Sequence, residues 1–389
     1  MMVSEQRSTL GFIPRFACQG IAHCGNPSRP PWLALLVWVL ICLPASALEL
    51  RVAVREGASQ VTVGTSNNGV LRDLNGQTLG QVTGGRSLVM AAQGAQVKAG
   101  DQQRGAFWVE PGAGGYVFIG DRWYRGRVLI TPSGNGLTAI NYVDLEHYLY
   151  SVVGGEMPTS WPIEALKAQA VAARSYVLYH RNRGRNPQFD VGSTTAWQVY
   201  NGLQDEAQST QTAVEGTRGQ VLTYNGQIIE AVFHSSSGGH TENVEDVWSQ
   251  PVPYLRGVRD FDAGAPVYQW SETLSIDEFS RRVPGVGALR SAQPRRTTPQ
   301  GRVVELLIEG DAGSRVLSGT DLRRALNLRS TLFSVAINGS TVQISGRGYG
   351  HGIGLSQWGA RNMAAQGYTY QQILGHYYQG AQLAQVQAQ

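Results

Sequence analysis

The hydrophobic pattern changes its period once along the chain, and this change restricts the fold more than any other feature. Residues 50–140 are short apolar alternations separated by glycine-rich turns, a pattern typical of half-buried strands. Farther on, Ile163, Leu166, Ala170 and Val177 recur at spacings of three, four and seven residues, which places them on one face of a helix. The sequence therefore predicts an α+β fold, with a β-rich N-terminal part and a mixed sheet with a few helices around a substrate cleft.

Local signals predict several boundaries within this fold. Ser160 is expected to cap the long helix, with Pro162 in its first turn, and the helix is expected to end near Gly184. An Asn225-Gly226 pair between two apolar runs predicts a hairpin. Residues 284–302 are rich in proline, glycine and arginine and are expected to form a surface loop.

The first 47 residues have the pattern of a secretory signal peptide. Arginines precede the apolar run 32–43, and Ala45-Ser46-Ala47 supplies the small residues of a cleavage site. The run is shorter than the roughly 20 residues that cross a bilayer, although an uncleaved anchor remains an alternative. We expect a periplasmic or secreted protein. All three cysteines lie in this segment, so the mature chain would contain no disulfide.

The distribution of basic residues argues against a nucleic-acid partner. The formal net charge is +4, and Lys98 and Lys167 are the only lysines among the 32 basic residues. The arginines are spread along the chain without a polybasic run, so a nucleic-acid footprint is not expected.

A carboxylate preceded by two glycines is the first candidate for a catalytic residue. The two glycines are expected to free the backbone in a turn just before this carboxylate, and Gly154-Gly155-Glu156-Met157-Pro158 leads toward Trp161 and the long helix. Partial desolvation of Glu156 between Met157 and Trp161 would raise its pKa, as a general acid requires. The alternative is that Glu156 caps a turn near the helix.

Arg174 is the second candidate because it borders the buried face of the long helix. A long cation in that position needs a partner, and an ordinary structural ion pair explains it as well as a functional role does.

Two further segments place histidines beside backbone-rich loops. Residues 233–241 carry His234 and His240 around a Ser-Ser-Ser-Gly-Gly run. A substrate-binding loop, a weak metal site and His–Ser nucleophilic catalysis are the alternatives, and the last lacks a G-x-S-x-G elbow. Residues 346–359 have glycine at every second position from 346 to 354. They either expose His351, Gln357 and Trp358 to a groove or pack the loop closely on a sheet.

These segments, in this order, resemble the stage II sporulation protein D family, also called the amidase-enhancer or lytic-transglycosylase domain of bacterial cell walls. The resemblance covers about residues 120–380. The matching segments are residues 144–158, 164–176, 234–239, 320–323 with 329–330, and 346–359.

The resemblance implies a lytic transglycosylase that cleaves peptidoglycan glycan strands and leaves 1,6-anhydro-muramyl ends. Glu156 matches the family's catalytic glutamate, and Arg174 matches an arginine tied to activity. His234, Ser235, Ser236, His351 and Gln357 match cleft positions and are expected to bind substrate. The roles of His240 and His376 stay open.

Some family members hold zinc near the Ser-Gly-Gly loop through cysteine and histidine. The mature chain has no cysteine, so we predict no metal and no cofactor. The expected partners are glycan strands and, as a further candidate, a cell-wall amidase. A non-catalytic glycan-binding activator of an amidase and a metal-dependent amidase using His234, His240 and His351 are the rival interpretations.

The predicted division of the chain has four parts. It comprises a signal peptide (1–47), a β-rich region (48–120), a sporulation-protein-D-like catalytic domain (121–380) and a tail (381–389).

Overall fold

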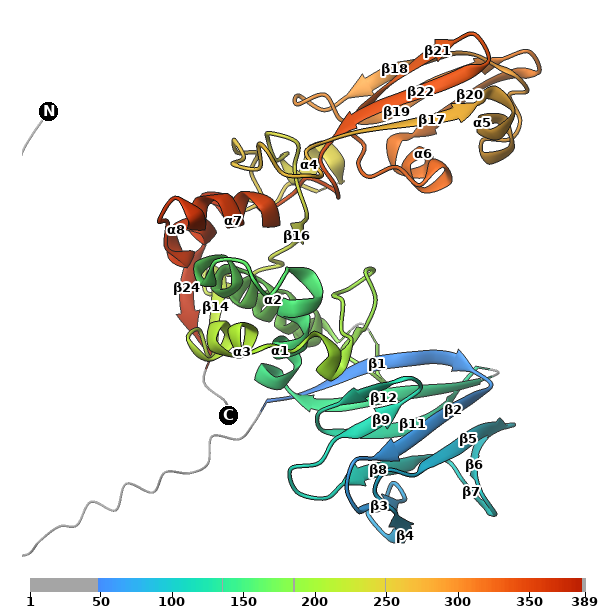
Figure 1. The fold of residues 1–389 in the computed structure, drawn as a ribbon, viewed down its shortest axis with the longest axis vertical. Coiled ribbons are helices and arrows are strands. Elements are labelled where there is room, and N and C mark those ends of the chain that lie inside the picture. The colour runs from blue at the N-terminus through green and yellow to red at the C-terminus, as the bar shows by residue number, and fades with distance from the viewer. Residues whose placement is uncertain (1–47, 135, 185, 249, 387–389) are drawn as a thin grey trace, which may run out of the picture. The chain divides into compact units, whose positions relative to one another are not determined.

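The computed structural model describes residues 48–134, 136–184, 186–248 and 250–386. The predicted signal peptide and the last three residues of the predicted tail lie outside these residues. The described residues form eight α-helices and six sheets, which confirms the α+β prediction (Figure 1).

The β-rich part consists of two sheets. The seven-stranded sheet has the order β13 (Val191–Gly192), β1 (Glu49–Ala58), β12 (Gly136–Asp144), β11 (Arg127–Ser133), β8 (Phe107–Pro111), β3 (Gly69–Arg72) and β4 (Thr78–Val82). The six-stranded sheet has the order β10 (Arg122–Tyr124), β9 (Val117–Ile119), β2 (Gln60–Thr65), β5 (Ser87–Gln93), β6 (Gln96–Ala99) and β7 (Gln102–Arg104). Neighbouring strands are antiparallel except for β1 and β13.

The two sheets share one hydrophobic core, which explains the alternation in the sequence. Val61 and Val63 of β2 and Phe107 and Val109 of β8 are fully or almost fully buried members of the same cluster. Their spacing of two places them on one face of each strand. Both sheets continue past residue 120. The larger one includes β11, β12 and β13, which pair with one another or with strands of the N-terminal region.

The central helices are α1 (Leu145–Glu156), α2 (Ile163–Arg183), α3 (Gln208–Glu215), α7 (Gln357–Ala365) and α8 (Tyr370–Tyr377). A short 3₁₀ helix, η1 (Gly202–Asp205), and a sheet of β15 (Gln227–Ile228), β14 (Gln220–Tyr224) and β24 (Gln382–Gln385) accompany them. The predicted hairpin is confirmed, since Tyr224 pairs with Gln227.

The long helix begins later than predicted. Pro162 occupies the N-cap position without a side-chain bond, so the expected Ser160 cap is wrong. The other end is confirmed, because Gly184 terminates the helix in a left-handed conformation with φ of 53°.

Helix α1 was not expected from the hydrophobic pattern, although its cap is visible in the sequence. The Asp144 side chain accepts hydrogen bonds from the backbone N–H groups of Glu146 and His147. This bonding satisfies two of the free donors of the first turn.

A second hydrophobic cluster lies within residues 270–344 and is built around Phe279, Ile308, Leu322 and Val342. One of its sheets has the order β17 (Gln269–Ser275), β22 (Thr341–Arg347) and β21 (Phe333–Asn338), and the other has the order β18 (Leu289–Thr297), β19 (Val303–Gly310) and β20 (Gly313–Ser318). The helices are α5 (Ile276–Arg282) and α6 (Gly319–Leu326), which Figure 1 shows beside these strands.

The middle of the segment predicted as a surface loop at residues 284–302 is strand β18, so that prediction is wrong for residues 289–297. The strand lies at the edge of its sheet, and its second half, residues 293–297, is exposed. An edge strand can contain a proline such as Pro294 and lack apolar alternation, because one side faces solvent.

Two short parallel strands, β16 (Phe233–His234) and β23 (Leu355–Ser356), and the helix α4 (Val244–Val247) complete the fold. Within the part of the chain that the structure describes, no helix has the length and apolar character needed to span a membrane.

Candidate active site

A cavity of about 420 Å³ brings together most of the residues predicted from the sequence. Its lining includes Glu156, His234, Ser235, His351 and Gln357. Arg174 and Ser236 are not among the residues that line it. The rest of the lining is Tyr176, Thr195, Ala196, Trp197, Glu230, Val232, Phe233, Trp248, Tyr349 and Gly350.

Parallel pairing of β16 with β23 assembles one wall of this cavity. Phe233 pairs with Leu355 and His234 with Ser356. Gln357, the first residue of α7, therefore lies next to His234 in space although the two are far apart in sequence. The Ser-Gly and glycine-rich loops are joined as well, because Ser236 and Tyr349 exchange two backbone hydrogen bonds of 3.0 and 2.8 Å.

The alternating glycines permit this close approach. Gly350 has φ of 113°, and a Cβ there would lie 2.7 Å from the Cβ of His234. Any larger residue would be strained in conformation and would displace the histidine. Both interpretations of the loop therefore apply: it packs closely on its neighbour and it presents His351 to the cavity.

Glu156 is the last residue of α1 and is only partly exposed. Its Oε1 accepts a 2.8 Å hydrogen bond from the backbone N–H of Val199. Burial raises the pKa of the Glu156 carboxyl, opposed by this bond and by the nearby Gln357 side chain. The Gln357 side chain lies near this carboxyl, but its Nε2 atom forms no hydrogen bond with any described residue.

The two glycines before Glu156 have a different role from the one inferred from the sequence. They lie inside α1 rather than in a flexible turn. A Cβ on Gly154 would collide with the carbonyl oxygen of Asp205, and one on Gly155 would lie 3.0 Å from the carbonyl oxygen of Val199. They allow residues 199–205 to pack against the end of α1, which places the Val199 N–H at Glu156.

The expected neighbours of Glu156 are also arranged differently. Met157 is 1% exposed and belongs to the hydrophobic core. Trp161 packs edge-on against Trp358, with ring centroids 4.7 Å apart. Neither residue lines the cavity, so the two do not enclose Glu156 on its cavity side.

The two cavity histidines are held in the neutral form. His351 lies between the Phe233 carbonyl oxygen, 2.9 Å from its Nε2, and the Ile353 N–H, which donates to its Nδ1 at 3.1 Å. Burial lowers the pKa of His351 to about 4 and that of His234 well below its usual value.

His234 keeps one nitrogen available. Its Nδ1 lies 3.1 Å from the Ile353 carbonyl oxygen, so Nδ1 carries the proton and Nε2 is an acceptor. The structure gives Nε2 no hydrogen-bond partner among the described residues. A substrate hydroxyl could donate to it.

Arg174 is fully buried in an ion pair with Glu146. Its Nε and Nη2 atoms bind the two carboxylate oxygens of Glu146 at 3.1 and 2.5 Å, and Nη1 donates to the Gln220 carbonyl oxygen at 3.0 Å. This geometry gives Arg174 a structural partner and no surface toward the cavity.

Ser236 is likewise buried rather than exposed to substrate. Its hydroxyl donates to Oδ2 of Asp262 at 2.5 Å, and the neighbouring Ser237 hydroxyl donates to Asp260 at 2.5 Å. Burial and the nearby charge of Asp260 raise the pKa of Asp262 to about 6. These bonds hold the Ser-Gly loop against the segment that follows it.

Several cavity residues were not predicted from the sequence. Trp197 and Thr195 come from the segment after β13, and Trp248 follows α4, both irregular regions without a recognisable motif. Glu230 adds a second carboxylate, which lies 3.3 Å from Nε2 of His180. Only the tertiary fold brings these segments together.

The other histidines that the structure describes lie outside this lining. His240 Nδ1 is 2.6 Å from the Thr241 carbonyl oxygen, and His376 Nε2 is 2.8 Å from that of Arg259. Among the described residues, no group of three or more His, Cys, Asp or Glu is arranged to hold a metal ion. The absence of a metal stays a prediction.

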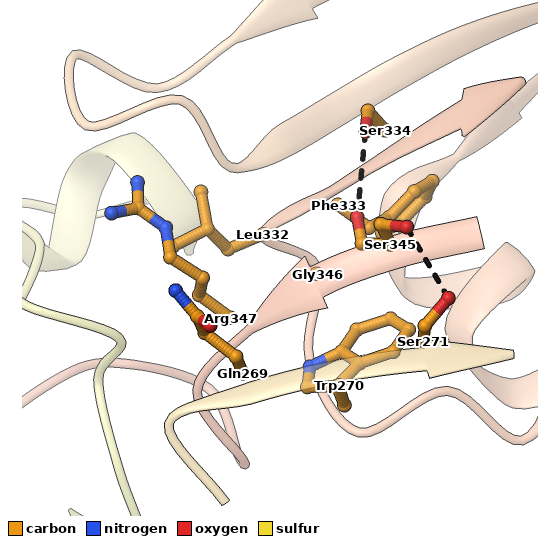
Figure 2. Close-up of a pocket in the computed structure, with 9 residues that line it drawn as sticks. All are labelled: Gln269, Trp270, Ser271, Leu332, Phe333, Ser334, Ser345, Gly346 and Arg347. Carbon is orange, nitrogen blue, oxygen red and sulfur yellow. Dashed lines mark hydrogen bonds between the residues drawn. The ribbon is translucent and has the colours of Figure 1, made fainter. Parts of the chain in front are cut away.

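Another cavity lies on the sheet of β17, β22 and β21. Figure 2 shows Trp270 beneath Gly346 and a hydrogen bond between Ser271 and Ser345. The two hydroxyl oxygens lie 3.3 Å apart. Among the described residues that line it, Arg347 is the only one with a charged side chain, and none offers a carboxyl or imidazole group. The described lining of this cavity therefore offers no carboxyl or imidazole group for proton transfer.

Two family models match parts of this chain. A family model described as stage II sporulation protein matches residues 133–224, and a domain of unknown function (DUF8618) matches residues 259–354. The first range contains Glu156, and the second contains the second hydrophobic cluster and the glycine-rich loop up to Gly354.

Three relatives illustrate the similarity. Stage II sporulation protein D of Bacillus amyloliquefaciens is 38% identical over 265 residues, covering 64% of this chain and 76% of that protein. An uncharacterised protein of Brachyspira hyodysenteriae is 34% identical over 278 residues, covering 69% and 74%. The amidase enhancer of Bacillus subtilis is 34% identical over 290 residues, covering 60% of this chain and 40% of that protein. The chain belongs to the stage II sporulation protein D family.

Proposed function

We propose that this protein is a cell-wall enzyme, a lytic transglycosylase that cleaves the bond between N-acetylmuramic acid and N-acetylglucosamine in peptidoglycan. The observation that carries the proposal is Glu156, a carboxyl with a raised pKa in a cavity lined by aromatic, amide and imidazole groups. We further propose that it acts in the periplasm or outside the cell, with glycan strands and a cell-wall amidase as partners.

The reaction requires one group that gives a proton and then takes one. Protonated Glu156 would donate to the glycosidic oxygen as the bond to C1 breaks. The resulting carboxylate would then accept the proton of the muramyl 6-hydroxyl as that oxygen closes on C1. The raised pKa supports the first step, because a larger fraction of the carboxyl stays protonated near neutral pH.

The surroundings of Glu156 suit this double role. The Val199 N–H fixes one carboxyl oxygen, and no arginine or lysine forms an ion pair with Glu156 among the described residues. A cation in that position would lower the pKa and hold the group as a carboxylate. One neutral hydrogen-bond donor orients the carboxyl without preventing its protonation.

The other cavity residues would position the sugar. Trp197 and Trp248 offer apolar ring faces of the kind on which sugar rings stack. Nε2 of His234 can accept a hydrogen bond from a hydroxyl, and the amide of Gln357 can bind an N-acetyl group or hydroxyl. Holding the 6-hydroxyl of the same sugar near C1 makes the second step intramolecular, which favours it over attack by water.

Replacement of Glu156 by glutamine tests this role. The carbonyl oxygen of the introduced amide can still accept the Val199 N–H, so the fold and glycan binding are expected to persist. The rate of anhydro-end formation should fall by about 10⁴, the upper range for a positioned proton-transfer group. Turnover on purified glycan strands and strand binding would be measured side by side.

Glu56→Gln is the matched control, because Glu56 is an exposed carboxyl on β1. It should leave both turnover and binding unchanged. A Glu156→Gln protein that folds, binds strands and forms anhydro ends at the normal rate would contradict the assignment. If wild-type protein binds strands and never yields such ends, the amidase-activator interpretation replaces the enzyme.

A further inference from the structure

A groove next to the active-site cavity carries a concentration of arginine side chains. Its volume is about 780 Å³, and it lies on the second hydrophobic cluster along α6 and the turn that follows. Arg323, Arg324 and Arg329 line it together with Tyr349 and one acidic residue, Glu272. The remaining lining residues are Val267, Thr320, Asn327 and Leu328.

The local fold explains why the arginines converge. Asn327 ends α6 in a left-handed conformation with φ of 56°, and its backbone N–H bonds back to the last turn of the helix. The chain therefore reverses after the helix, and the Leu328 N–H donates to the Arg323 carbonyl oxygen at 2.9 Å. This reversal brings Arg329 to the same groove as Arg323.

Two of these arginines have no acidic partner. Arg324 is exposed and lies 3.3 Å from Asp321. By contrast, Arg323 and Arg329 are half-buried and form no ion pair with any described residue. The Nε atom of Arg323 donates to the Leu328 carbonyl oxygen at 3.2 Å, which leaves the rest of its guanidinium for another acceptor.

The groove is physically linked to the cavity of Glu156. Tyr349 lines both, and 45% of its surface is exposed. The Gly350 N–H donates to the Arg329 carbonyl oxygen at 2.9 Å, which connects the groove to the glycine-rich loop. The positive charge of Arg323 also contributes to lowering the pKa of His234 and of His351.

We infer that Arg323 and Arg329 form a subsite for a carboxylate carried by the muramyl residue of the glycan, with Tyr349 contacting the sugar between the subsite and the cleft. The inference rests on the proposed function. A planar guanidinium binds a carboxylate through two parallel hydrogen bonds, and half-burial strengthens the attraction by excluding solvent. The carboxylate is either that of the free lactyl ether or one in the attached peptide.

Binding measurements on three strand preparations test the subsite. The first carries free lactyl carboxylates after peptide removal, the second is the same material with its carboxyls reduced to alcohols, and the third retains the peptides. The Arg323→Gln/Arg329→Gln variant should bind the carboxylate-bearing strands about tenfold more weakly, the loss expected for a charge-assisted hydrogen bond. Its affinity for the reduced strands should equal that of the wild type.

The two carboxylate-bearing preparations distinguish the sources of the carboxylate. A loss on peptide-free strands identifies the lactyl carboxylate, and a loss confined to peptide-bearing strands identifies the peptide. Arg290→Gln/Arg295→Gln is the matched control, since both residues are exposed on β18 and line none of these cavities. It removes the same charge and should change none of the affinities.

Equal losses on carboxylate-bearing and reduced strands, or no loss on any strand, would overturn the subsite. An Arg323→Lys/Arg329→Lys variant guards against misfolding, because it keeps the charge and should recover part of the lost affinity. If wild-type protein binds none of the three preparations, the proposed function fails and the subsite with it. Wild-type binding that the double variant fully retains removes the subsite alone.

Discussion

Helix α1 has a glutamate near each end, and the two have opposite surroundings. Glu146, in the first turn, is 5% exposed and has both oxygens bound by Arg174, with a further bond from the Gly219 N–H at 3.1 Å. Glu156, the last residue, accepts a hydrogen bond from the Val199 N–H and has the Gln357 side chain nearby. One carboxylate is neutralised by a buried cation, and the other borders a cavity.

The difference shows how one helix can support both structure and chemistry. Both oxygens of Glu146 are occupied by Arg174 and the Gly219 N–H, so this carboxylate serves the packing of the helix. A carboxyl that is desolvated without a cation is easier to protonate, because burial disfavours its charge. The position of Glu156 at the helix C-terminus acts in the same direction, since that end disfavours anions. The predictions below test this contrast.

Removing the cation from the structural pair should have the largest effect on stability. Arg174→Gln leaves Glu146 buried without its partner and should lower the free energy of unfolding by about 3–5 kcal/mol. Arg174→Lys should also be destabilising, because one ammonium cannot replace the two-oxygen contact. Urea unfolding monitored by circular dichroism measures both losses.

Turnover separates this structural role from the activity-linked role that the family resemblance implies for Arg174. If Arg174 acts only through Glu146, the folded fraction of Arg174→Lys should cleave strands at nearly the normal rate. Glu146→Gln/Arg174→Gln should recover part of the lost stability, because the unpaired buried charge is gone. A strongly reduced turnover number in a stable Arg174→Lys protein would show that the arginine affects the chemistry.

The second carboxylate of the cavity should matter less than Glu156. Glu230 lies 3.3 Å from Nε2 of His180 and also bonds to Tyr179. Because the proposed reaction needs only one proton-transferring carboxyl, Glu230→Gln should slow strand cleavage by less than about tenfold, in contrast to the roughly 10²–10⁴ expected for a proton-transfer group. A loss as large as that of Glu156→Gln would instead indicate the two-carboxylate mechanism of ordinary glycosidases.

The smallest expected effect is on the pH dependence of stability, to which the charge of Glu156 contributes. Its folded-state pKa is raised by burial, so its stability contribution is present below the unfolded pKa and is lost as the pH rises through the folded pKa. The Glu156→Gln protein has no charge at this position, so it should not lose this stability as the pH rises. Its melting temperature should match the wild type near pH 4 and exceed it at pH 8 by an amount on the order of 1 °C.

His351 provides an internal comparison of opposite sign. Its pKa is lowered to about 4 by burial, so its contribution is present above the ordinary histidine pKa and is lost as the pH falls toward the lowered one. Wild type and Glu156→Gln should therefore both lose stability between about pH 6.5 and pH 4. A melting-temperature difference that grows toward low pH would contradict the assignment to Glu156.

The sequence predicted the parts of the fold that depend on local patterns. Alternation indicated the β-rich region, and Gly184 and the Asn225-Gly226 pair indicated boundaries that the structure confirms. Strand β18 was missed because an edge strand with exposed polar residues has no apolar alternation. Helix α1 was missed because Gly154 and Gly155 suggested a flexible turn, whereas they allow close packing against Val199 and Asp205.

The candidate site was predictable only where its residues occur in motifs. Glu156, His234, Ser235, His351 and Gln357 stand in the motifs on which the family resemblance rests, and the fold brings them to one cavity. The partner of Arg174 was not predictable, since Glu146 lies 28 residues earlier and is brought near by packing of α1 on α2. Trp197, Trp248 and Glu230 reach the cavity from segments with no shared pattern.

The chemical fate of the cleaved bond distinguishes a lytic transglycosylase from a hydrolase. Purified glycan strands would be digested by wild-type protein in water enriched in heavy oxygen, and the new ends would be analysed by mass spectrometry. Intramolecular closure onto C1 predicts muramyl ends that are lighter by one water than hydrolysis products and contain no heavy oxygen. Reducing ends that carry heavy oxygen would show that water attacks C1, and would contradict intramolecular closure and with it the transglycosylase assignment.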